Sequence, residues 1–293
     1  MPQATMGLLH PGEMGGTVGA AAKAAGARVV WASEDRSPAS RSRASAYELE
    51  DVGSMDRLAA TADFVISICP PHSALEVARS VAALRFTGVY IDANAVSPAS
   101  ARSMASLIEN AGGTFVDGGI IGPPAVKPGT TRLYLSGPQV ARVARLFQGS
   151  VLETVQMHSP IGAASALKMA YSSWNEGSAA LLIALRAFAI TEGIDAELLA
   201  EWRQSIPDLP ARSERTLSLN ARNAWRFVGE MEEIADTFRA AGFPTGFPVA
   251  AREIYQRLSH YKGAASPPSF TEVADDIRAT ETLAPGGEPA GGD

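Results

Sequence analysis

The sequence has one cysteine, Cys69, in 293 residues, so an intramolecular disulfide and a cysteine-based metal site are both excluded. Its four histidines are scattered and show no metal-ligand spacing. Positive charge is also in deficit, because 25 Lys and Arg stand against 31 Asp and Glu, a formal net charge of −6. We therefore expect no metal site and no nucleic-acid partner.

Long hydrophobic runs are missing as well. The most apolar run, residues 179–185, is followed by Arg186 and is far shorter than the roughly 20 residues of a membrane-spanning helix. The first residues contain no basic segment followed by an apolar one, so the sequence predicts no signal peptide. Apolar residues still make up 46% of the chain, enough for a sizeable core. These features predict a folded cytoplasmic protein without a membrane partner, and its length predicts two domains.

The first part of the chain alternates short apolar runs with helical patterns. Strands are expected at residues 5–10, 28–32, 64–69, 89–92, 114–116 and 131–135. Helices are expected at 16–25, near 41–50, at 74–84 and at 99–111. This alternation predicts βαβ units and a parallel sheet, with a ligand site at the carboxyl ends of the strands.

Strand patterns stop after about residue 160. We expect a helix at 161–191, apolar nearly all round over 179–190 and therefore buried on every side. Further helices are expected at 196–204, 212–220, 224–241 and 248–261, and the Gly/Pro-rich residues 284–293 are predicted to be a disordered tail. The predicted fold is an α/β Rossmann-like N-terminal domain (1–160) followed by an all-α C-terminal domain (161–283), linked by a long interdomain helix.

A glycine turn follows the first predicted strand. It has two of the three glycines of a dinucleotide-binding turn, Gly12 and Gly15, with His10 in place of the first. Gly12 would let the backbone approach a pyrophosphate, and the helix N-terminus would supply N–H donors. An ordinary strand-to-helix turn is the alternative. The residues predicted to contact the cofactor here are His10, Pro11, Gly12, Glu13, Met14 and Gly15.

The end of the second strand favours NADP(H) over NAD(H). Ser33 stands there in place of an acidic residue, and Arg36, Ser37 and further arginines follow. Arginine pairs with a 2′-phosphate, whereas a carboxylate would repel it. Two observations count against this interpretation: Glu34 and Asp35 lie beside Ser33, and the arginines could belong to a solvated helix face.

Four segments resemble the β-hydroxyacid dehydrogenase superfamily, which includes 3-hydroxyisobutyrate and 6-phosphogluconate dehydrogenases and the related imine reductases. They are the Gly-x-Met-Gly turn that begins at Gly12, Val-Tyr-Ile-Asp-Ala-Asn ending at Asn94, Phe-Val-Asp-Gly-Gly-Ile-Ile-Gly-Pro around Gly119, and Gly-Ala-Ala-Ser-Ala-Leu-Lys ending at Lys168. The resemblance covers nearly the whole chain. Residues 231–258 are similar to the helical C-terminal domain of a less characterised branch.

The resemblance implies that Lys168 is the general acid/base, because the family's catalytic lysine lies six residues after a glycine that opens the interdomain helix. Taken by itself, a lone lysine more often extends its amine to solvent. Ser172 occupies the place of the family's Asn one turn later. Asn175 follows at i+7, so Lys168, Ser172 and Asn175 would face one cleft. Tyr171 is a second candidate proton donor.

Other positions depart from the family pattern. Asn94 replaces a substrate-binding serine and is expected to contact both cofactor and substrate. Together with Ser172 and Asn175 it would orient the substrate and Lys168 for catalysis. Ile121, Gly122 and Pro123 align with the family's Ser-Gly-Gly, which holds a substrate carboxylate. Cys69 and Pro70 end a strand where their backbone would line the cofactor, with Cys69 itself interpreted as a small buried hydrophobe.

The sequence as a whole predicts an NADP(H)-dependent oxidoreductase that moves hydride between nicotinamide and a C–O centre of a small-molecule substrate. One alternative is an imine reductase acting on C=N, although those enzymes usually lack a lysine at this position. A second is a catalytically silent NADP-binding protein. The apolar segment 179–190 would need more burial than one small helical domain supplies, so a homodimer through the helical domain is expected.

Overall fold

The structure is a computed structural model that describes residues 3–278, so the predicted tail at 284–293 lies outside the described residues. Contacts divide the chain into two compact units, which are treated separately. Within the described residues, unit 1 comprises 3–175 and 229–249, and unit 2 comprises 176–228 and 250–278. No helix in the described part of the chain is both long and apolar enough to cross a membrane.

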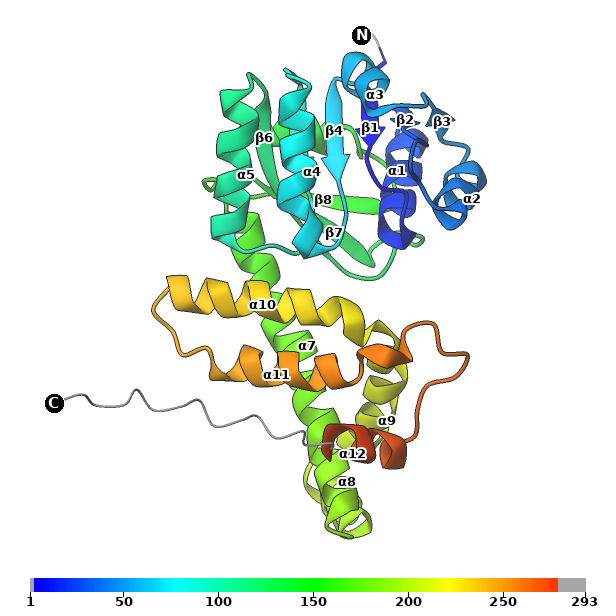
Figure 1. The fold of residues 1–293 in the computed structure, drawn as a ribbon, viewed down its shortest axis with the longest axis vertical. Coiled ribbons are helices and arrows are strands. Elements are labelled where there is room, and N and C mark those ends of the chain that lie inside the picture. Colours follow the sequence, from blue (N-terminus) through cyan, green and yellow to red (C-terminus); the bar gives the residue numbers. More distant parts are fainter. Residues whose placement is uncertain (1–2, 279–293) are drawn as a thin grey trace, which may run out of the picture. The chain divides into compact units, whose positions relative to one another are not determined.

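Unit 1 is built on one sheet, whose strands are ordered β3-β2-β1-β4-β5-β6-β7-β8 (Figure 1). The strands are β1 Thr5–Leu8, β2 Arg28–Trp31, β3 Glu50–Asp51, β4 Phe64–Ser67, β5 Val89–Asp92, β6 Thr114–Ile121, β7 Thr131–Ser136 and β8 Leu152–Gln156. The predicted α/β Rossmann-like fold is confirmed. The expectation of a wholly parallel sheet is wrong at one place, because β7 runs antiparallel to β6. The short loop between them leaves no room for a crossover helix.

Helices cover both faces of this sheet. They are α1 Glu13–Ala24, α2 Pro38–Ala46, α3 Met55–Thr61, α4 Pro71–Ala83, α5 Pro98–Asn110 and α6 Val140–Arg145. The core forms two buried clusters, one with residues of α1, α2 and α6, the other with residues of α4 and α5, which lie side by side (Figure 1). Neighbouring residues of a strand divide between them, as Val65 and Ile66 of β4 do, because side chains alternate across a sheet.

Local capping residues explain where the helices begin. Ser37 and Ser97 accept the backbone N–H groups of Ser40 and Ser100, and a proline follows each of them at the first helical position. The helix predicted near 41–50 is therefore displaced: it begins at Pro38, and residues 50 and 51 form β3. The sequence reasoning missed this Ser-Pro start, which is a recognisable signal.

Strand β6 is longer than predicted, because it continues through Gly118 and Gly119. A Cβ atom on Gly119 would lie 2.8 Å from the carbonyl oxygen of Ala164 and 3.2 Å from Cβ of Lys168. The glycine thus lets the first turns of α7 (Ala163–Thr191) pack directly on the strand.

Unit 2 contains helices, as the predicted all-α domain requires. They are the remainder of α7, then α8 Asp195–Ser205, α9 Leu209–Asn220, the start of α10 Ala224–Ala240, most of α11 Gly246–Arg257, and α12 Phe270–Arg278, with 3-10 turns η1 Ala221–Asn223 and η2 Ser259–Tyr261. Arg186 of α7 is buried at their centre. It pairs with Asp195 at 2.6 Å and Glu214 at 3.1 Å, and its guanidinium lies over the Phe270 ring.

The prediction that residues 179–190 are buried on every side is wrong for the single chain. Ala179, Ile183 and Ala187 are buried, but Leu181 and Phe188 are each 58% exposed and Leu185 is 42% exposed. Their spacing of four and three residues places these three side chains on one face of α7. One chain therefore buries only the opposite side of this apolar helix.

Candidate active site

The glycine turn joins β1 to α1, as expected. A Cβ atom on Gly12 would meet no other atom within 4 Å, whereas one on Gly15 would lie 2.1 Å from the carbonyl oxygen of His10. Gly12 caps α1 with no side-chain hydrogen bond, and Glu13 and Met14 begin the first turn. The turn thus combines a tight backbone with an uncapped helix N-terminus, and it has open space where a pyrophosphate would approach.

One arginine side chain of α2 contacts this turn, and a second contacts the backbone that precedes α2. Arg43 of α2 donates from Nε to the carbonyl oxygen of Pro11 (2.9 Å), and Arg41 donates to the carbonyl oxygen of Arg36 (3.3 Å). These two arginines support the backbone of the site, which argues against a purely solvated face. Ser37 caps α2, and Ser33 is buried with its N–H donating to Asp51.

Two buried nitrogen atoms in this region, Nε of Arg36 and Nδ1 of His10, have no hydrogen-bond partner. Burial, with a further contribution from the Arg36 charge, lowers the pKa of His10 to about 4, so its imidazole is neutral at pH 7. An unpartnered guanidinium N–H and a neutral imidazole can bind a ligand through charge-assisted and neutral hydrogen bonds. Together with the glycine turn, these atoms fit the adenosine end of a dinucleotide cofactor.

A row of polar side chains crosses four neighbouring strands, at the last residues of β4, β5 and β7 and in the middle of β6. Ser67, Asp92, Asp117 and Ser136 are neighbours in the strand register, and all four are fully buried. Burial first, and then the adjacent Asp117 charge, raise the pKa of Asp92 to about 8. Asp92 is therefore largely protonated at neutral pH, while Asp117 is surrounded by hydrogen-bond donors.

Asn94 has a structural role in this row. Its Nδ2 donates to Asp92 Oδ1 (2.5 Å) and to Ser67 Oγ (3.1 Å), and its Oδ1 accepts the N–H of Cys69 (2.5 Å). Both amide hydrogens are thus used within the protein, which joins the ends of β4 and β5 beside Pro70, the residue before α4. Burial raises the pKa of the Cys69 thiol to about 12, which fits a small buried hydrophobe better than a nucleophile.

Asp117 fixes the start of α7. Its Oδ2 accepts the backbone N–H groups of Gly162, Ala164 and Ser165 and the hydroxyl of Ser136, at 2.8–3.1 Å. Its Oδ1 accepts the Ser165 hydroxyl at 2.6 Å. A carboxylate at a helix N-terminus is stabilised by the helix dipole as well as by these bonds. Lys168 lies on the next turn of α7, so this cap determines where its side chain begins.

Lys168 is 15% exposed, and its Nζ lies 3.7 Å from Oε2 of Glu230, a residue of α10 that also belongs to unit 1. Gly119 beneath it brings the helix onto β6. Lys168 therefore does not extend its amine to solvent, which was the alternative for a lone lysine. A partly buried ammonium beside the carboxyl ends of parallel strands can donate a proton to a bound substrate.

The other predicted site residues differ in burial. Ser172 is fully buried, and its hydroxyl has no hydrogen-bond partner. Asn175 and Tyr171 are exposed, so burial varies within the set expected to share one cleft. Ile121 is buried at the end of β6, whereas Gly122 and Pro123 are exposed. Gly122 has a φ of 125°, and a Cβ atom there would lie 2.2 Å from the carbonyl oxygen of Thr130.

Sequence reasoning missed three acidic side chains of this region: Asp92 and Asp117 as a buried pair, and Glu230 as the partner of Lys168. The aspartates had a usable signal, because each ends or interrupts an apolar strand where a charge is costly. Glu230 had no such signal in the sequence, because two helices, α8 and α9, separate Lys168 from α10.

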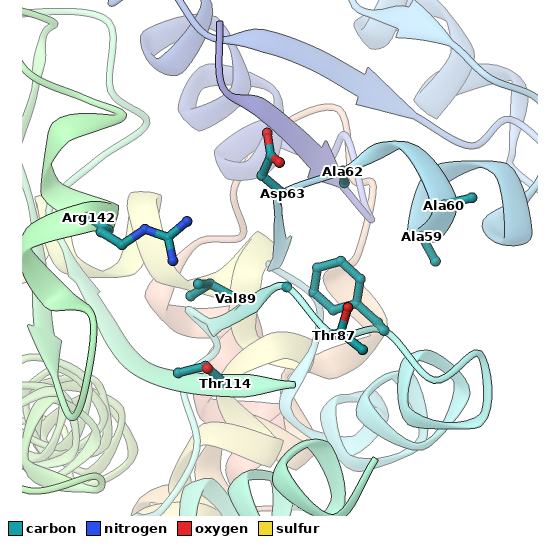
Figure 2. Close-up of a pocket in the computed structure, with 10 residues that line it drawn as sticks. Ala59, Ala60, Ala62, Asp63, Thr87, Val89, Thr114 and Arg142 are labelled. Carbon is teal, nitrogen blue, oxygen red and sulfur yellow. The ribbon is translucent and has the colours of Figure 1, made fainter. Parts of the chain in front are cut away.

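A separate cavity lies at the opposite, amino-terminal edge of the same strands (Figure 2). It has a volume of about 310 Å³ and is lined by residues that precede or begin β4, β5 and β6, among them Asp63, Thr87 and Thr114. Arg142 of α6 points into it (Figure 2). The cavity contains none of the predicted cofactor or catalytic residues and is distinct from the candidate site.

Comparison with known proteins identifies two matching domains and several similar structures. Residues 5–148 match the model of the NAD binding domain of 6-phosphogluconate dehydrogenase, and residues 189–258 match DUF1932, a domain of unknown function. A solved structure of a conserved protein of unknown function, described as structurally similar to 3-hydroxyacid dehydrogenases, is 28% identical with a TM-score of 0.66; the match covers 88% of this chain and 97% of that one. The two domain matches and this neighbour agree with the resemblance to the β-hydroxyacid dehydrogenase superfamily.

More distant solved structures share the fold. The 3-hydroxyisobutyrate dehydrogenase of Mycobacterium tuberculosis is 20% identical with a TM-score of 0.70, over 94% of this chain and 100% of that one. An imine reductase of Bacillus cereus is 20% identical with a TM-score of 0.55, over 95% and 100%. An uncharacterized 28.5 kDa protein of Methanothermus fervidus is 33% identical over 143 residues, which are 48% of this chain and about half (54%) of that relative.

Proposed function

We propose that this protein is an NADP(H)-dependent oxidoreductase that moves hydride between nicotinamide and a C–O centre, with Lys168 as the general acid/base. The observation that carries the proposal is the position of Lys168, mostly buried and fixed above Gly119 by the Asp117 cap, in the same unit as the glycine turn. The match of residues 5–148 to an NAD binding domain supports the cofactor class.

The chain's own residues would share the work as follows. Gly12, Gly15 and the N-terminus of α1 would hold the pyrophosphate, with Arg36 and His10 at the adenosine ribose. Bound NADP(H) would supply or accept the hydride. Lys168 would give a proton to the substrate oxygen during reduction or take it during oxidation. Ser172, whose buried hydroxyl is unpartnered, would hydrogen-bond the same oxygen.

Lysine at this position favours the carbonyl or alcohol reaction over reduction of C=N, because an iminium substrate arrives already protonated. The departures at Ile121, Gly122 and Pro123 leave no serine hydroxyl for a substrate carboxylate. We therefore favour a neutral carbonyl compound over a small hydroxy acid as the substrate.

The deciding experiment follows absorbance of NADPH and NADH with panels of aldehydes, ketones, hydroxy acids and imines. Replacing Lys168 by Ala should lower turnover of a carbonyl substrate by roughly a hundredfold or more. Lys127→Ala, at an exposed lysine, serves as the matched control and should retain activity. Full activity of Lys168→Ala would refute the acid/base role, and cofactor binding without turnover on any panel would favour a silent NADP-binding protein.

Preference for NADPH is tested at Arg36. Because its buried Nε–H has no partner in the protein, Arg36→Ala should weaken binding of NADPH at least tenfold more than binding of NADH, as measured by fluorescence titration. Arg57→Ala, at an exposed arginine of α3, should leave both affinities unchanged. Equal loss for the two cofactors would show that Arg36 does not contact a 2′-phosphate.

The exposed apolar face of α7, formed by Leu181, Leu185 and Phe188, supports a homodimer. Soluble chains rarely leave adjacent large aliphatic and aromatic side chains in water unless a partner covers them. We propose that a second copy of this chain covers this face.

A further inference from the structure

A buried hydroxyl on α1 is bonded to the loop between β6 and β7. Thr17, in the second turn of α1, is 2% exposed. Its Oγ1 donates to the carbonyl oxygen of Met14 (2.9 Å) and accepts the backbone N–H of Ala125 (3.0 Å), 108 positions later in the chain. Ala125 is 4% exposed and belongs to the core cluster against which Met14 packs. One side chain thus joins the start of α1, where a pyrophosphate would approach, to a distant loop.

The path of this loop crosses the edge of the sheet where a cofactor would bind. β4 and β5 lie between β1, which leads into α1, and β6, which leads into the loop. β6 runs parallel to β5 and continues beyond its end as far as Ile121. To reach Thr17, residues 122–126 (the bridging segment) therefore pass beside the carboxyl ends of β5 and β4. In a doubly wound sheet this edge is where dinucleotides bind.

The bridging segment is fixed at both of its ends. At the β6 end, Oγ1 of the buried Thr131 donates to the carbonyl oxygen of Pro123 (2.6 Å). At the α1 end, Thr17 holds the N–H of Ala125. Pro123 and Pro124 have no N–H group, so Ala125 carries the first donor after them that can anchor the segment to α1. The hydroxyl of Thr17 therefore decides where the segment lies against the helix.

We infer that Thr17 is a positioning residue that holds the bridging segment across the pyrophosphate and nicotinamide of a bound dinucleotide. The inference rests on the cofactor class of the proposed function, and it does not depend on which compound is reduced. Thr17 acts through Ala125, and the segment excludes water from the cofactor. Two consecutive prolines suit this place, because backbone without N–H groups does not compete with the N-terminus of α1 for the phosphates.

The topology separates the covered half of the dinucleotide from the uncovered half. The bridging segment reaches α1 from the side of β4, whereas Arg36 follows β2, on the other side of β1. Arg36 and His10 are the groups proposed above for the adenosine ribose. The adenosine end therefore lies outside the bridging segment, which predicts that Thr17 affects binding of the whole dinucleotide but not of its adenosine half.

Amide hydrogen exchange of the full-length protein, measured by mass spectrometry with and without NADPH, reads the segment directly. NADPH should slow exchange in peptides that contain residues 122–126. Thr17→Val removes the hydroxyl at nearly constant size and should speed exchange of the Ala125 amide, whereas Thr17→Ser should behave as the unsubstituted protein. Thr61→Val is the matched control, because the exposed Thr61 hydroxyl bonds within its own helix α3.

A second measurement separates positioning from a general loss of stability. NADPH should dissociate from Thr17→Val about fivefold faster or more in stopped-flow fluorescence, as expected for the loss of one buried hydrogen bond. Adenosine 2′,5′-bisphosphate, which ends before the second phosphate of the pyrophosphate, should bind Thr17→Val and the unsubstituted protein equally. Equal weakening of both ligands would mean that Thr17 only stabilises α1, and would overturn the inference.

The exchange experiment on the unsubstituted protein decides even if Thr17→Val does not fold. NADPH binding without slower exchange in residues 122–126 would overturn the inference and leave the proposed function intact. Slower exchange there, combined with no turnover of any aldehyde, ketone, hydroxy acid or imine, would support the inference while the proposed function fails. A protein that binds neither NADPH nor NADH would refute both.

Discussion

Asp92 is a carboxyl group kept protonated by its surroundings, with Asp117 next to it in the strand register and Asn94 bonded to its Oδ1. Its pKa is raised from 3.8 to about 8 by burial and by the Asp117 and Glu233 charges. Between these two pH values the folded state binds more protons at this group than the unfolded state does. The contribution of Asp92 to stability is therefore greatest at low pH and decreases as the pH rises toward 8.

This dependence predicts the behaviour of Asp92→Asn, which removes the titration while keeping an acceptor for Asn94. The melting temperature of the unsubstituted protein should fall more between pH 5 and pH 8 than that of Asp92→Asn. Differential scanning calorimetry at both pH values measures the difference. If the melting temperatures of the two proteins instead changed equally between pH 5 and pH 8, Asp92 would be ionised in the folded state over this range.

At the residue scale, sequence reasoning succeeded where a motif had local context. Gly12 and Gly15 could be placed because a strand preceded them and a helix followed. The hydrogen bonds by which Asn94 joins β4 and β5 could not be predicted from the sequence, because its partners Ser67 and Cys69 lie on another strand and on the loop after that strand. Glu230 was beyond reach for the same reason: a pair formed between distant helices leaves no pattern at either position.

At the scale of elements, the start of α7 depends on one side chain. Replacing Asp117 by Asn removes the charge that accepts the N–H groups of Gly162, Ala164 and Ser165. The side-chain NH2 group of the new asparagine would also point toward some of these backbone N–H groups. We expect a loss of about 2–4 kcal/mol in the free energy of unfolding, by analogy with other buried charged networks.

Urea unfolding monitored by circular dichroism measures this loss, and Ser165→Ala provides the matched comparison. That variant removes the single hydroxyl bond to Asp117 Oδ1 and should cost about 1 kcal/mol. Equal costs for the two variants would mean that the backbone N–H groups find other partners when the carboxylate is lost.

Element types were predictable from periodicity, but their ends depended on signals of a different kind. The Rossmann-like order followed from alternating apolar runs, which report burial directly. The start of α2 depended on Ser37 and Pro38, and the extension of β6 depended on what packs over Gly119. The reversal of β7 also has no periodic signature, because strand direction is set by the length of the connection.

At the scale of the whole molecule, the apolar face of α7 predicts self-association. Light scattering at micromolar concentration should report twice the 30.6 kDa mass of one chain. Leu185→Glu should shift the protein toward the monomer, because it would bury an unpaired charge in the interface. Leu219→Glu, at an exposed leucine of α9, should leave the dimer intact. A monomeric unsubstituted protein would contradict the expectation.

The discontinuity of unit 1 has a consequence for biosynthesis. Its two segments are separated by residues 176–228, and Glu233 bonds to Ser97, 136 positions earlier in the chain. The whole sheet, the glycine turn and Lys168 are therefore synthesised before the segment that carries Glu230 and Glu233. At ordinary rates of translation this interval lasts several seconds. During that time the nascent chain can already fold its sheet, but Lys168 has no carboxylate partner, so the Lys168–Glu230 ion pair is completed only late in synthesis.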